Sequence, residues 1–149
     1  MNRMLKLKGL LITGTSAVGK RLGDTAVDLI IPSLFSELGC KSVKEAMLLL
    51  KTTYEQDAEL TNYRNEIGEL LLKRLHKGIP SDSNKFSPGG IYVFDADLFY
   101  NFSKDTMRIQ DILAVMQIIG DGTVIRVVSK YHGMCKGRPV QPAYCRRIV

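Results

Sequence analysis

One segment of the sequence, residues 78–90, divides the chain into two parts of different character. It is rich in Ser, Pro, Gly and Asn, which favour turns and loops. Apolar residues recur at helical spacing before it, whereas short β-rich runs follow it. We therefore expect an α+β fold, with a helical first half packed on a small, mostly antiparallel sheet that ends in a long basic C-terminal hairpin. Because 149 residues is a usual size for one domain, we expect a single domain, 1–149, with a flexible internal loop at 78–90.

The first half is expected to begin with one strand and one helix. The apolar run 9–13 predicts a short buried strand. Asp24 is a suitable cap for a helix over 24–38, in which Pro32 introduces a bend or a restart and Gly39 provides the end.

Further helices are expected over residues 42–77. Ser42 and Glu45 are spaced as in a capping box, so a helix should begin at Ser42. The apolar period shifts near Asp57, which predicts either two helices or one long helix with a stutter, ending at Lys77.

The second half combines strands with helices. Residues 91–94 predict a strand, and Asp97 is expected to cap a short helix from Leu98. An apolar stripe predicts a helix over 106–119 with Asp105 or Ser103 as its cap, ended by the glycines at 120–122.

The last part of the chain predicts a hairpin. Residues 123–131 alternate as in a half-buried strand, with Ile125, Val127 and Tyr131 on its apolar face. A loop at 132–137 would return the chain to a second strand over 140–149, placed at a sheet edge by its prolines.

The charge of the chain is unevenly distributed. The net charge is +6, yet all 15 Asp and Glu residues lie within 22–125, so both ends are basic and free of acids. Such cations bind phosphates by counterion release, and the nearby Tyr131 and Tyr144 offer rings for stacking on bases. We therefore expect a non-enzymatic protein that binds nucleic acid or another polyanion. The candidate residues are Arg126, Lys130, Lys136, Arg138, Arg146, Arg147, Lys6 and Lys8. Arg146 and Arg147 are expected to be exposed, and the same charges also suit a solvated surface that keeps the protein soluble.

Residues 14–21 resemble the Walker A loop of P-loop kinases, including the apolar lead-in at 10–14. The resemblance implies phosphate-binding roles for Gly14, Gly19 and Lys20, and Asp95 resembles the Walker B aspartate. Arg21 stands where that motif has the magnesium-binding hydroxyl. The alternative function is therefore a P-loop-like nucleotide-binding or phosphotransfer protein with a degenerate loop.

Other features bear on partners and location. The apolar helices at 42–77 allow a further alternative, a self-associating structural or adaptor protein that forms a homo-oligomer. Three cysteines without framework spacing favour free thiols, hence an intracellular location: cytoplasm, nucleus or virion interior. No apolar run is long enough for a membrane helix, so no membrane partner is expected. We also expect no cofactor and no metal.

Overall fold

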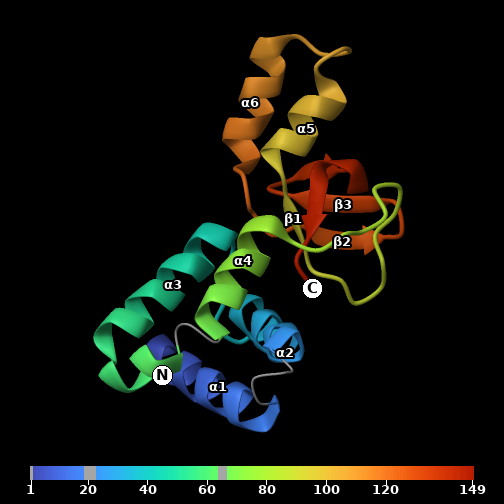
Figure 1. The fold of residues 1–149 in the computed structure, drawn as a ribbon. Coiled ribbons are helices and arrows are strands. Elements are labelled where there is room, and N and C mark those ends of the chain that lie inside the picture. Colours follow the sequence, from blue (N-terminus) through green and yellow to red (C-terminus); the bar gives the residue numbers. More distant parts are fainter. Residues whose placement is uncertain (1, 19–22, 64–66) are drawn as a thin grey trace. The chain divides into compact units, whose positions relative to one another are not determined.

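The structure, a computed structural model, describes residues 2–18, 23–63 and 67–149 (Figure 1). It is α+β, with helices in the first half and two antiparallel sheets in the second, as the sequence predicts. The chain forms two compact units, Met1–Lys77 and Gly78–Val149, and their boundary coincides with the beginning of segment 78–90. A single domain over 1–149 stays a prediction.

The described part of the first unit is helical. Its elements are α1 (Arg3–Val18), α2 (Gly23–Phe35), α3 (Val43–Gln56), the 3-10 helix η2 (Ala58–Tyr63) and α4 (Glu69–Lys77). Helix α1 packs on α2 and α3, and α4 contacts both α2 and α3. Aliphatic side chains from all five elements and their connections are buried among them: Leu7, Leu11, Ile30, Ile31, Leu34, Leu50, Leu60, Ile67, Leu71 and Leu75.

The strand expected at 9–13 is wrong, because these residues belong to α1. Leu7 and Leu11 are one helical turn apart and both are fully buried. A short apolar run fits a buried helix segment as well as a buried strand, and here packing against α2 and α3 selects the helix.

The capping box at the start of α3 is confirmed. The Ser42 hydroxyl accepts a hydrogen bond from the Glu45 backbone N–H at 3.2 Å. The Glu45 carboxylate accepts from the Lys41 N–H, one residue before the amide that the usual box engages. Helix α3 ends at Gln56, the backbone of the next residue, Asp57, is extended, and η2 follows. The predicted phase shift near Asp57 therefore marks a break between separate helices.

The helix predicted over 24–38 is α2 (Gly23–Phe35), so Asp24 lies inside the helix rather than at its cap, and the helix ends three residues earlier than expected. Pro32 lies inside it. Gly39 has a φ of +70°, a conformation that favours glycine, but it follows the turn after Phe35 and does not itself end the helix as expected.

The second unit combines two helices with two small sheets. Its elements are β1 (Tyr92–Phe94), α5 (Ala96–Ser103), α6 (Ile109–Ile119), β2 (Arg126–Ser129), β3 (His132–Cys135), β4 (Arg138–Val140), the 3-10 helix η4 (Pro142–Tyr144) and β5 (Cys145–Arg147). Helices α5 and α6 lie side by side (Figure 1). Strand β1 pairs with β5, whereas β2, β3 and β4 form a separate sheet in sequence order. The unit has its own core, made of Phe86, Tyr92, Phe94, Phe99, Ile112, Ile119, Ile125, Cys135, Val140 and Cys145.

The long C-terminal hairpin is wrong. The expected loop contains β3, which pairs with β2 on one side and β4 on the other. Two-residue turns, Lys130–Tyr131 and Lys136–Gly137, connect these strands. Both residues of the second turn have positive φ, 50° and 76°, as in the type I′ turns that suit hairpins. The last strand, β5, leaves this sheet to pair with β1.

Strand β2 is also shorter and more exposed than the sequence predicts. It covers only Arg126–Ser129, and its register with β3 shifts between Val127 and Ser129. Of the three residues expected on its apolar face, only Ile125 is buried, whereas Val127 and Tyr131 are 39% and 67% exposed.

The helix caps of this unit differ from those expected. Asp95, not Asp97, caps α5, and its carboxylate accepts from the Leu98 N–H at 2.9 Å. Arg108 occupies the cap position of α6 without a side-chain cap bond. Ser103 instead ends α5 and is buried.

Segment 78–90 is attached to the strands near both of its ends. The Ile79 N–H donates to the Arg147 carbonyl, and the Phe86 N–H donates to the Lys130 carbonyl, both at 2.7 Å. Pro88 and Gly89 form a turn closed by a bond from the Gly90 N–H to the Ser87 carbonyl. Gly89 has a φ of +76°, which matches a type II turn. The turn is therefore held beside the β2–β3 connection, while the flexibility of the whole segment stays a prediction.

Candidate nucleic-acid interface

The eight cations expected to bind a polyanion fall into two groups. Three of them, Arg126, Lys130 and Arg138, are exposed and have no ion pair within the residues that the structure describes. The other five bind groups of the chain itself: Lys6, Lys8, Lys136, Arg146 and Arg147.

Arg146 and Arg147 are not the exposed tail that the sequence predicts. The Arg146 side chain is 12% exposed, and its Nη1 lies 3.2 Å from an Asp95 oxygen and 3.5 Å from an Asp121 oxygen. Arg147 donates from Nε to the Val149 carbonyl at 2.8 Å, and its guanidinium lies 6.0 Å from the centroid of the Tyr92 ring. Because β5 pairs with β1, both arginines contact groups of the chain itself.

Lys136 binds the C-terminal end of α6. Its Nζ donates to the carbonyls of Ile118 and Ile119 at 3.2 and 2.9 Å. These are carbonyls that a helix C-terminus leaves without intrahelical donors, and a cation is favourable there.

The two N-terminal candidates belong to the first unit and are also ion-paired. Lys6 lies 3.3 Å from Glu37, and Lys8 lies 2.8 Å from both Asp57 and Glu59. The hydrogen bond to Asp57, followed by that to Glu59, raises the pKa of Lys8 to about 12. The same bond from Lys8 lowers the pKa of Asp57. Lys6 therefore connects α1 to the segment after α2, and Lys8 connects α1 to the α3–η2 junction.

Of the three remaining cations, Arg126 and Arg138 lie in the β2–β3–β4 sheet and Lys130 lies in the turn that connects β2 to β3. Arg126 lies opposite Met134, which in turn lies opposite Pro139, so Arg126 and Arg138 occupy the same end of the sheet but project from its opposite faces. They are two strands apart, a separation of about 10 Å between backbones. Lys130 lies at the other end, beside the exposed Tyr131.

A recess of about 420 Å³ lies between the 86–90 turn and β2, which is an edge strand. It is lined by Phe86, Ser87, Pro88, Gly89, Gly90, Val127, Ser129 and Lys130. The bond between Phe86 and Lys130 also brings Lys85, an exposed cation, next to Lys130. Neither the role of Lys85 nor the recess could be predicted from the sequence, because both depend on a contact between residues far apart in the chain. The Pro88–Gly89 pair was the one local signal of this turn.

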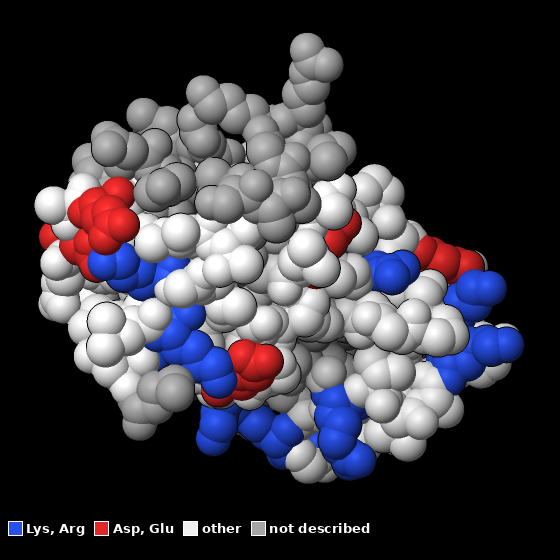
Figure 2. Space-filling model, turned by 90° about the horizontal axis from the view of Figure 1, so that it is seen from below, with Lys and Arg blue, Asp and Glu red and all other residues white. Residues whose placement is uncertain are grey.

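Pairing of charges is visible on the molecular surface. Figure 2 shows Lys and Arg side chains over one face of the structure, several of them beside Asp or Glu side chains. The formal charge of the chain therefore overstates how many cations are available to a ligand.

The residues that resemble a P-loop do not follow a strand. Residues 10–18 belong to α1, so the lead-in and Gly14 are helical, while Gly19 and Lys20 lie outside the described residues. Asp95 does follow a strand, but it caps α5 and pairs with Arg146. Phosphate binding by the 14–20 segment stays a prediction, but the strand expected before this segment is a helix.

Three further observations concern the described residues. They contain no cluster of three His, Cys, Asp or Glu side chains suited to a metal ion. Within the described ranges, no helix has both the length and the apolar character needed to cross a membrane. All three cysteines are buried free thiols, and burial raises the pKa of Cys145 to about 12.

Comparisons with known protein families, with curated proteins and with solved structures found nothing that matches this chain.

Proposed function

We propose that the protein binds a single-stranded segment of nucleic acid, without catalysis, through the β2–β3–β4 sheet and the adjoining recess. One observation carries the proposal: Arg126 and Arg138 in the β2–β3–β4 sheet, and Lys130 in its β2–β3 turn, are exposed and have no ion pair within the described chain. This site lies within the second unit and does not include the N-terminal lysines.

The charge of this sheet supports an anionic ligand. Asp121 is the last acid in the sequence, so β2, β3 and β4 contain cations without acids. Like charges held on one sheet repel each other, whereas a phosphate chain neutralises them and releases its counterions. Each phosphate contact to a single strand should contribute about −0.7 to the slope of log affinity against log salt.

The recess and Tyr131 support a single strand over a duplex. An unstacked base with its sugar is of the size that a recess of 420 Å³ accepts. Tyr131 is 67% exposed at the neighbouring turn, where its ring is available for stacking. Stacking of a base on an aromatic ring contributes about 1–3 kcal/mol and tolerates any sequence. The proposal therefore predicts weak sequence preference and strong salt dependence.

The test is fluorescence anisotropy with a labelled ten-nucleotide oligo(dT) or oligo(U), titrated at 50 mM and higher salt. We expect the Arg126→Ala/Lys130→Ala variant to bind at least about tenfold more weakly, with a salt slope smaller in magnitude by about 1.4. The matched control is Lys44→Ala/Lys51→Ala, which removes two exposed lysines of the first unit and should change neither quantity.

Absence of binding by the wild type at 50 mM salt, where screening is weak, would refute the proposal. Equal losses of affinity in the two double variants would show that binding depends only on the net charge of the protein. The comparison of DNA with RNA identifies which strand the site prefers. We further propose that the protein acts in a reducing intracellular compartment, because its three thiols are free.

A further inference from the structure

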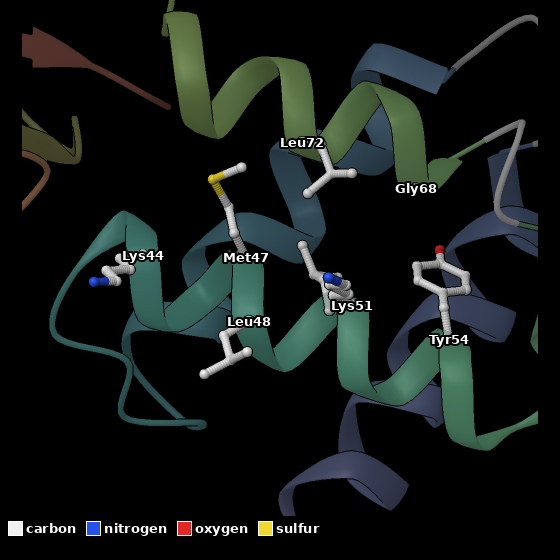
Figure 3. Close-up of a pocket in the computed structure, with 8 residues that line it drawn as sticks. Lys44, Met47, Leu48, Lys51, Tyr54, Gly68 and Leu72 are labelled. Carbon is white, nitrogen blue, oxygen red and sulfur yellow. The ribbon is translucent and has the colours of Figure 1, made fainter.

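An apolar cleft of about 350 Å³ lies between α3 and α4 of the first unit. Met47 and Leu48 of α3 and Leu72 of α4 contribute to its walls, and Figure 3 shows Met47 and Leu72 directed into the space between the helices. Pockets of this size with apolar walls are typical of sites for small ligands.

Gly68 and Tyr54 define one end of the cleft. Figure 3 shows the Tyr54 ring reaching from α3 toward Gly68, at the start of the α4 segment. A Cβ atom at position 68 would lie 3.0 Å from the Tyr54 ring, so glycine permits the close approach of the two elements. This end is closed by the aromatic ring and the backbone.

Two lysines flank the cleft on α3. Lys44 and Lys51 are seven residues apart, so they lie on one face of the helix about 10 Å from each other. Both are exposed, and neither has an ion pair among the residues described by the structure. Leu48 lies between them and is 63% exposed. An apolar surface bordered by unpaired cations is complementary to a ligand that has both an apolar part and a negative charge.

We infer that this cleft binds an amphiphile with a single alkyl chain and an anionic head group. The alkyl chain occupies the space between Met47 and Leu72, and the head group lies at Lys44 and Lys51. The volume of 350 Å³ corresponds to roughly twelve methylene groups, if each takes about the 30 Å³ of a water molecule in the liquid. Burial of methylene groups is favourable, so the alkyl chain supplies most of the affinity and the lysines select the charge.

The test uses the full chain and monomeric dodecanoate as the probe, by titration calorimetry and by NMR of ¹³C-methyl methionine. We expect one binding site and a shift of the Met47 methyl signal, identified by its loss in Met47→Leu. The Lys44→Gln/Lys51→Gln variant should bind at least about tenfold more weakly. The matched control, Lys73→Gln/Lys77→Gln, removes two lysines of α4 that do not line the cleft and should bind as the wild type does.

Further titrations distinguish between head groups and test other ligands for the cleft. Binding of dodecyl phosphate as well as dodecanoate supports recognition by charge, whereas binding of only one shows which head group is selected. Dodecyltrimethylammonium, with the same chain and the opposite charge, should not bind. The inference is overturned if this cation binds as tightly, if the Met47 signal does not shift, or if the lysine variant keeps full affinity. Binding only to anionic phospholipid vesicles, or only to an acidic amphipathic peptide, would equally overturn it.

Discussion

Arg146 lies between two carboxylates that both bind the beginning of α5. Asp95 accepts from the Leu98 N–H, and Asp121 accepts from the Ala96 N–H, each at 2.9 Å. The guanidinium of Arg146 lies within 3.5 Å of both carboxylates, so one cation joins β5 to the α5 cap and to the loop after α6. From sequence alone, Arg146 is one more cation in a basic tail, because its partners are 51 and 25 residues away.

We predict that Arg146→Ala destabilises the protein, unlike loss of an exposed arginine. Without the guanidinium, the largely buried Asp95 carboxylate and the exposed Asp121 carboxylate lie near each other with no cation between them. We expect a loss of about 2–4 kcal/mol in the free energy of unfolding, measured by urea denaturation. Arg126→Ala, at an exposed position, should change it by less than about 0.5 kcal/mol. Equal effects of the two substitutions would show that the Arg146 bridge does not stabilise the fold.

The cysteines allow a second prediction at this scale. Burial raises the pKa of Cys40, Cys135 and Cys145, and that of Cys145 reaches about 12. Because the thiolate is the reactive form, the folded protein should react slowly with iodoacetamide at pH 8. Mass spectrometry should find little alkylation in buffer and three modifications in urea, with Cys145 the least reactive in the folded state. Rapid alkylation of Cys145 in buffer would contradict its burial.

At the scale of elements, local sequence signals predicted where a helix begins or ends if one residue type determines the backbone conformation there. The Ser42–Glu45 box located the start of α3, and the glycines at 120 and 122 ended α6 with φ values of 83° and 79°. The sequence did not predict strands whose formation depends on pairing between distant segments. Residues 132–135 include a glycine and lack β-branched residues, so β3 has no strand signal of its own. It forms because two tight turns place it between β2 and β4.

The candidate site was predictable to a similar degree. The absence of acids after Asp121 led to the region now proposed, and Arg126, Lys130 and Arg138 are exposed there. Which cations are bound within the chain was not predictable, since ion pairs such as that of Lys8 with Asp57 depend on how α1 packs against the end of α3.

The Lys8–Asp57 pair predicts a pH dependence of stability. Lys8 lowers the folded-state pKa of Asp57, so the contribution of Asp57 is complete above the ordinary carboxyl pKa near 4 and is lost as pH falls through the lower folded value. The pKa of Lys8 is raised to about 12, so its contribution is complete below its ordinary pKa and is lost only as pH rises through about 12.

The pair should therefore stabilise the fold uniformly from about pH 5 to pH 9. We predict that the difference in free energy of unfolding between wild type and Lys8→Met is constant over this range and shrinks below about pH 4. The control Lys41→Met, at an exposed lysine on the helix connection, should show a much smaller change with pH. A Lys8→Met difference that persists unchanged to pH 2.5 would exclude the pair as its cause.

At the scale of the whole molecule, the two units use different means of stabilisation. The first unit buries aliphatic side chains between helices, whereas the second relies on a core rich in aromatic rings. Within the second, Phe86 and Tyr92 pack edge to face at 4.9 Å, and Phe99 and Tyr144 do so at 4.8 Å. Self-association through helices 42–77 stays a prediction, and a concentration series in light scattering would test it directly.

The separate core leads to a prediction about how many cooperative domains the chain contains. Both sheets, the core cluster and the proposed nucleic-acid site lie within Gly78–Val149. We predict that this fragment folds alone, with a stability of no more than about 3–5 kcal/mol, because domains of about 70 residues rarely exceed that without crosslinks. It should show a sigmoidal urea transition by near-UV circular dichroism and should bind the oligonucleotide with the affinity of the full chain.

The matched variant is the same fragment with Phe94→Ala. This substitution removes a fully buried ring at a typical loss of about 3–5 kcal/mol in the free energy of unfolding and should abolish the transition. A wild-type fragment without a cooperative transition would instead show that residues 1–149 fold as the single domain expected from the length of the chain. A fragment that folds but does not bind, beside a full chain that does, would place essential ligand contacts in the first unit.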